Sequence, residues 1–205
     1  MSVSVSVRML ATKYFLVLVL ALGSAFVCNG QISDTDTALS DEAALLDALQ
    51  HSEPADVNQY DEIVNNLQQL AELGRRNRIM FPETFRELTR FLEVEKLLEN
   101  YYGSLATPTH LDTHPAMLAL YYGGDDVLPL LTDILVNEPE TAKKWKLTLW
   151  EIIYIKKADF PATYNYLVER AKDSRSSYER ERLGIAAQKM KECLLPEPCS
   201  ALRAS

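Results

Sequence analysis

The stretch VNQYDEIVNNLQQLAELG, residues 57–74, carries an apolar side chain at every third or fourth position. These side chains belong to Val57, Tyr60, Val64, Leu67 and Ala71. Such spacing places them on one face of a helix, where they can be buried together. Glycine is the residue that most readily adopts the left-handed conformation that ends many helices. The stretch therefore predicts an amphipathic α-helix that ends at Gly74.

Similar apolar spacing continues along the chain, interrupted by proline, glycine and aspartate. From Pro82 an apolar stripe reaches Gly103 and predicts a second helix. Later helices are expected to start at Pro115, Asp125 or Asp126, Pro139, Asp159 and Ser176. From residue 31 onward the sequence lacks Asn-Gly and Asp-Gly hairpin turns and alternating apolar and polar runs. We therefore predict an all-α fold, an irregular bundle or stacked helical hairpins of about seven to eight helices, with the helical domain at residues 57–193.

Residues 1–30 have the pattern of a secretory signal peptide. Arg8 and Lys13 precede an apolar run at residues 14–22, and small residues follow at 23–25. This combination is typical of a signal that is removed on export, and the apolar run is too short for a membrane-spanning helix. Cleavage after Gly30 and cleavage after Ala25 both fit, so the sequence leaves open whether Cys28 is retained. We predict a secreted, extracellular protein with no membrane span after signal removal.

The two cysteines near the carboxyl terminus are expected to form a disulfide. Cys193 and Cys199 are separated by five residues, two of them proline. Outside the cell such a pair is oxidised. This predicts a disulfide clasp between the last helix and a C-terminal tail at residues 194–205.

Residues 31–56 contain seven acidic side chains and no lysine or arginine. Ser40, followed by Asp41 and Glu42, favours a short helix start, because anions are stabilised near the amino end of a helix. We expect this segment to be an acidic, partly disordered leader that precedes the helical domain.

Charge and motif content exclude several classes of function. The net charge is −8 and no cluster of lysine and arginine is present, which argues against nucleic-acid binding. The sequence contains no Gly-x-Ser-x-Gly, Walker A or His-Glu-x-x-His motif. We predict a non-enzymatic protein without catalytic residues or cofactors.

Two of the three histidines are spaced as zinc ligands on a helix would be. His110 and His114 stand four residues apart with Asp112 between them. Pro108 and Pro115 bracket the segment, and the residue before a proline avoids the helical conformation. The sequence therefore favours a polar loop here and no metal site.

Tyrosine is prominent, with ten tyrosines against six phenylalanines. Tyr101 and Tyr102 precede Gly103, and Tyr121 and Tyr122 precede Gly123. Rings with a polar edge suit a half-hydrated pocket or the rim of a helix interface. The four tyrosines are candidate ligand-binding residues, and the expected partner is an extracellular protein or a small apolar ligand.

The tetrapeptide Leu73-Gly74-Arg75-Arg76 permits a second interpretation. It resembles the processing site of neuropeptide prohormones, in which glycine precedes two basic residues. The resemblance implies cleavage after Arg75-Arg76 and a released peptide, starting near Gln31, that is amidated at Leu73. The same residues also suit a helix end, where cations are stabilised near the carboxyl terminus.

Overall fold

The computed structural model describes residues 37–77, 81–94, 96–98 and 110–193. Within these ranges the chain is built from helices and turns, without a strand, so the predicted all-α fold is confirmed. The predicted signal peptide, Cys28, the Tyr101-Tyr102 pair and Cys199 lie outside the described residues. Cys193 is the last residue of the final helix, and its bridge to Cys199 stays a prediction.

The chain divides into two compact units, one up to Ala43 and one from Ala44 onward. The described part of the first unit, residues 37–43, is helical, and residues 44–50 of the second unit are helical. Helical structure thus begins before Ser40, the expected start. Leu49 is fully buried in the core of the second unit. The second unit thus begins before residue 57, the expected start of the helical domain.

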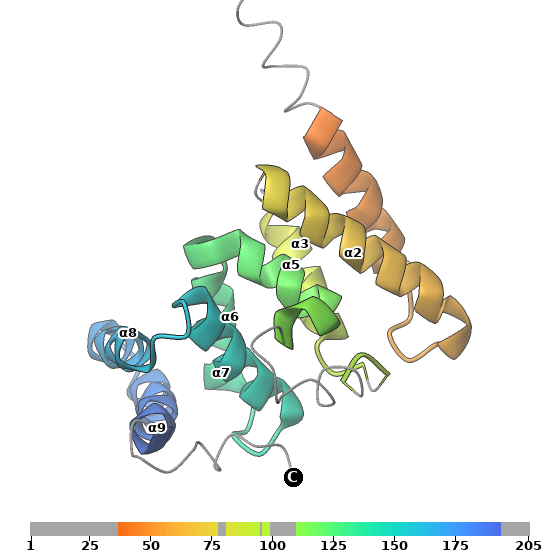
Figure 1. Ribbon diagram of the computed structural model, residues 1–205. Helices are drawn as coiled ribbons and strands as arrows, with labels where there is room; N and C mark the ends of the chain where they lie inside the picture. The colour runs from red at the N-terminus through yellow and green to blue at the C-terminus, as the bar shows by residue number, and fades with distance from the viewer. Residues whose placement is uncertain (1–36, 78–80, 95, 99–109, 194–205) are drawn as a thin grey trace, which may run out of the picture. The chain divides into compact units, whose positions relative to one another are not determined.

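The second unit contains the following elements in chain order. They are the 3₁₀ turn η1 (Val57–Gln59), α2 (Tyr60–Asn77), α3 (Pro82–Leu88), η2 (Thr89–Phe91), η3 (His110–Thr113), α5 (Pro115–Gly123), η4 (Gly124–Val127), α6 (Leu128–Asn137), α7 (Lys143–Ile155), α8 (Phe160–Asp173) and α9 (Ser177–Cys193). Helix α2 packs on α5, α6 packs on α7, and α8 packs on α9 (Figure 1). Further contacts join α5 to α7 and α6 to α9, so the α6–α7 pair connects the other two.

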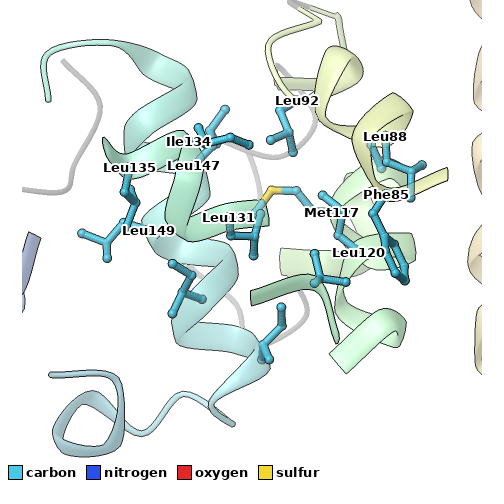
Figure 2. Close-up of a cluster of buried hydrophobic side chains, with 14 of the residues drawn as sticks. Phe85, Leu88, Leu92, Met117, Leu120, Leu131, Ile134, Leu135, Leu147 and Leu149 are labelled. Carbon is cyan, nitrogen blue, oxygen red and sulfur yellow. The ribbon is translucent and has the colours of Figure 1, made fainter. Parts of the chain in front are cut away.

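The core is formed by apolar side chains of α3, α5, α6 and α7 (Figure 2). Met117 and Leu120 of α5 lie between the side chains of the α3 region and those of α6 and α7. The labelled residues on the two sides are Phe85, Leu88, Leu92, Leu131, Ile134, Leu135, Leu147 and Leu149. Full burial of one such side chain contributes about 1.5–3 kcal/mol, so this cluster is a main source of stability.

Proline and aspartate begin several helices as the sequence predicts. A proline stands in the first turn of α3, α5, α6 and α8. Asp159 caps α8, because its Oδ1 accepts a hydrogen bond of 2.9 Å from the backbone N–H of Ala162. In α3, α5 and α8 the local sequence is sufficient to fix the start.

Two predicted helix starts are wrong. Helix α6 follows directly from η4, and neither Asp125 nor Asp126 caps it. Helix α7 begins at Lys143 and not at Pro139, because residues 139–142 form a turn closed by the N–H of Ala142 and the carbonyl of Pro139. The chain between α6 and α7 must reverse, and this turn accomplishes the reversal.

The long stripe after Pro82 does not form one helix. Helix α3 ends at Leu88, a 3₁₀ turn follows, and helix resumes at residues 96–98. Phe91 and Leu92 are both fully buried although they are adjacent in sequence. A bend allows both side chains to enter the core, whereas a straight surface helix turns neighbouring residues to different sides.

Gly74 does not end α2, which continues to Asn77. The glycine is buried and helical, and among the described residues only Gly124 is a glycine with positive φ. Glu72 binds the arginines three and four residues later and so stabilises one more helical turn. The predicted left-handed cap at Gly74 is therefore wrong.

Candidate ligand-binding pocket

A cavity of about 400 Å³ opens between two stretches of the second unit. Its lining is Pro54, Ala55, Asp56, Val57, Tyr60, Arg90, Glu93, Val94 and Lys96. Small-molecule sites in proteins commonly have volumes of about 300–1,000 Å³ and mostly apolar walls. The volume and the aliphatic and aromatic lining of this pocket fit a small ligand.

The first wall is held by hydrogen bonds that follow from its sequence. Ser52 Oγ donates to the carbonyl of Ala48 over 2.8 Å and ties the loop to the preceding helix. Asp56 Oδ1 accepts from the backbone N–H of Asn58 over 2.9 Å, which caps η1. The turn brings Tyr60, the first residue of α2, to the pocket and leaves Val57 75% exposed.

The second wall comes from the bend after α3. Arg90 Nη2 donates to the carbonyl of Ser52 over 3.3 Å and so connects the two walls. Arg90 also pairs with Glu87, three residues earlier. Glu93 Oε1 accepts from the backbone N–H of Lys144 over 3.1 Å, in the first turn of α7. The bend is thus fixed to the loop on one side and to α7 on the other.

The ammonium group of Lys96 lies over the ring of Tyr60. The distance from Nζ to the ring centroid is 3.8 Å, which is within the range of a cation–π interaction. Sequence reasoning missed this pocket, because Val57 and Tyr60 fit the buried face of a helix and the second wall is distant in the chain. The mixture of apolar and charged residues at 90–94 and 96 gives no signal that distinguishes a pocket wall from a solvated surface.

The candidate tyrosines lie elsewhere in the described structure or outside it. Tyr121 and Tyr122 are half-buried on α5 and pack against the core. Their ring centroids are 5.5 Å apart in an edge-on arrangement. Neither ring lines the pocket, and Tyr101 and Tyr102 lie outside the described residues.

The Leu73-Gly74-Arg75-Arg76 tetrapeptide forms part of the last turns of α2. Leu73 packs against the core, and both arginines are exposed. The Glu72 carboxylate accepts hydrogen bonds of 2.7 Å from Arg75 Nε and Nη2 and one of 2.6 Å from Arg76 Nε. The hydrogen bonds from Arg75, followed by those from Arg76, lower the pKa of Glu72 to about 2.

His114 is fully buried, so the predicted polar loop is wrong for this residue. Its Nδ1 accepts from the backbone N–H of Met117 over 3.4 Å and caps α5. The other ring nitrogen, Nε2, then carries the proton and donates to the carbonyl of Leu92 over 3.2 Å. Burial lowers the pKa of His114 to about 4 and keeps the ring neutral. In the described ranges, no group of three His, Cys, Asp or Glu side chains is placed to hold a metal ion.

A second buried titratable group, Glu151, lies on α7 and was not singled out from the sequence. Its carboxyl oxygens are fully buried and make no hydrogen bond, and neither does the buried Oγ1 of Thr148 one turn earlier. Burial raises the pKa of Glu151 well above its usual value. Burial therefore favours the neutral acid over the carboxylate.

None of the helices in the described part of the chain has the length and apolar character needed to cross a membrane. Comparison of the chain with protein-family models, with curated proteins and with solved structures found no match.

Proposed function

We propose that this protein is secreted and acts without catalysis by binding a small, mostly apolar molecule in the pocket formed by residues 54–60, 90–94 and 96. The observation that carries the proposal is the cavity of about 400 Å³ with Tyr60, Val57 and Val94 in its walls. Each 100 Å² of apolar ligand surface removed from water contributes about 2.5 kcal/mol. A ligand of this size gains most of its affinity from such burial.

Secretion and the absence of catalysis are supported by the sequence. Residues 1–30 carry the pattern of a signal peptide, and motifs of common enzyme classes are missing. Among the described residues that line the pocket there is no histidine, cysteine or serine that could act as a nucleophile or as a general base near neutral pH. These features favour a carrier or a ligand-sensing protein.

The neutral fluorophore N-phenyl-1-naphthylamine tests the proposal, because its emission rises in an apolar site. The wild-type protein is expected to bind it saturably. Ala55→Trp, which places an indole at the pocket from an exposed loop position, should weaken binding at least about tenfold. Tyr60→Ala should also weaken it, whereas Tyr178→Ala, at a tyrosine that is 55% exposed on α9, should not. Absence of saturable binding, or equal binding by all variants, would contradict the proposal.

A second candidate is a prohormone cleaved after Arg75-Arg76. It is favoured by the exposure of both arginine side chains near the end of α2. Mass spectrometry of the secreting tissue separates the two functions. A peptide of residues 31–73 with an amidated Leu73 would establish the prohormone, whereas an intact chain that starts near Gln31 supports the binding protein. If the secreted protein is isolated with a bound protein and without a bound small molecule, the pocket serves a protein partner.

A further inference from the structure

We propose that the ligand of this pocket is an anionic amphiphile, whose single negative head group binds the ammonium of Lys96 while its apolar body fills the cavity. This inference rests on the proposed function and specifies the chemical class of the ligand. The inference is drawn from the interaction partners of the four charged side chains of the lining, which are Asp56, Arg90, Glu93 and Lys96.

Both acidic side chains of the lining are engaged with backbone groups. Asp56 Oδ1 accepts from the backbone N–H and the side-chain Nδ2 of Asn58, over 2.9 and 3.1 Å. Glu93 Oε1 accepts from the backbone N–H of Lys144. The dipoles of these N–H groups point at the carboxylates and offset part of their field, so each repels a bound anion less than a carboxylate without N–H donors would.

The two basic side chains differ in their partners. Arg90 pairs with Glu87 and binds the carbonyl of Ser52. Lys96 contacts the face of the Tyr60 ring, and no carboxylate of the described residues lies within ion-pair distance of its Nζ. Of the four charges, the ammonium of Lys96 is therefore the one that a ligand can pair with.

The Tyr60 ring positions this ammonium at the apolar wall. A cation–π contact uses one side of the ammonium, and the remaining N–H groups can donate to an anion. The aromatic ring, Val57 and Val94 face the same cavity. A compact cation beside an apolar surface matches a molecule with one anionic end and a hydrocarbon body. Fatty acids and single-chain lipids share this chemistry.

Decanoate and decanol test the inference, because they share the alkyl chain and differ in the head group. Each is titrated against the full chain preloaded with N-phenyl-1-naphthylamine, at pH 7.5. Decanoate is expected to displace the fluorophore at a concentration about two- to fivefold lower than decanol, as for an ion pair at an exposed lysine. Lys96→Gln should abolish the difference, and Lys96→Arg should restore it. Lys191→Gln, an equal loss of charge at an exposed residue of α9, should leave the difference unchanged.

The outcomes separate the two proposals. Equal displacement by decanoate and decanol overturns the anionic head group and leaves the apolar pocket standing. Displacement by neither overturns both. A preference for decanoate that survives in Lys96→Gln also overturns the assignment to Lys96. A last experiment uses vesicles of phosphatidylglycerol. If the protein sediments with the vesicles and decanoate causes no saturable displacement of the fluorophore, the protein binds a membrane surface. That result would contradict a ligand in the pocket.

Discussion

The indole Nε1 of Trp145 donates a hydrogen bond of 3.1 Å to the backbone carbonyl of Leu135. Leu135 lies in the last turn of α6, where carbonyls have no partner within the helix. In a continued helix the donor would be residue 139, but this residue is proline and has no N–H. Arg182 of α9 donates to the carbonyls of Val136 and Glu138. Side chains of α7 and α9 thus complete the end of α6.

Replacing Trp145 by phenylalanine should lower the free energy of unfolding by about 1–3 kcal/mol. The substitution removes the indole N–H and leaves the buried Leu135 carbonyl without its partner. Urea unfolding followed by circular dichroism measures the change. An unchanged midpoint would contradict the role of this hydrogen bond.

Gly123→Ala should be destabilising by about 1–3 kcal/mol, because the added Cβ has no room. It would clash with Val127 Cγ2 and would lie 2.6 Å from Phe85 Cε1, a ring in the core. Gly184→Ala is the matched control, since a Cβ at this exposed position of α9 meets no atom within 4 Å. The control should stabilise the protein by about 0.5–1 kcal/mol through helix propensity. Thermal unfolding of both variants measures the shift in melting temperature. Equal shifts for Gly123→Ala and Gly184→Ala would refute the clash at Gly123.

Glu151→Leu should raise the free energy of unfolding at pH 7.5 by about 1–3 kcal/mol, since the wild-type carboxyl is buried without a hydrogen bond. Because burial raises the pKa of Glu151 in the folded state, the folded chain holds a proton that the unfolded chain releases above about pH 4.5. The contribution of Glu151 to stability is therefore greatest below this pH and falls as the pH rises. Urea unfolding of wild type and Glu151→Leu at pH 4.5 and 7.5 should show a difference that widens with pH. A constant difference would contradict the buried acid.

His114→Asn should change the pH dependence of the free energy of unfolding. The effect of His114 is opposite in direction to that of Glu151, because His114 lowers the stability as the pH falls. The folded pKa of about 4 lies below the usual value of 6.5, so acidification protonates the unfolded chain first. Wild-type stability should therefore fall between pH 6.5 and 4, by up to about 3 kcal/mol from this group. Asparagine can still cap α5 but does not titrate, so the variant should lack this part of the loss. Identical acid unfolding of variant and wild type would count against a neutral, buried imidazole.

Limited trypsin digestion should cut after Arg175 before it cuts after Arg75 or Arg76. Arg175 is exposed in the non-helical link between α8 and α9, whereas both other arginines are helical and bound by Glu72. A protease needs an extended substrate, so the last turn of α2 must unwind before cleavage. Glu72→Gln should accelerate cleavage after Arg76 relative to Arg175, measured by mass spectrometry. Initial cleavage after Arg75 or Arg76 would instead favour the prohormone.

The sequence alone determined the helical class and most of the buried faces. Leu67 and Ala71 of α2 lie on the predicted apolar face and are buried, because the spacing of apolar residues acts within a few turns of the same helix. The start of α8 was predictable for the same reason, since Asp159 binds a backbone group three residues later. Such interactions are local and need no knowledge of the rest of the fold.

Only the tertiary structure decided the environments of Gly74, His114 and Glu151 and the position of the pocket. His114 is buried because its ring binds a carbonyl 22 residues earlier in the chain. The pocket needs the loop at residues 54–57 beside the bend at residues 90–94 and Lys96. Segments so far apart meet through packing of the whole core, and the apolar pattern of one segment does not specify which distant segment will cover it.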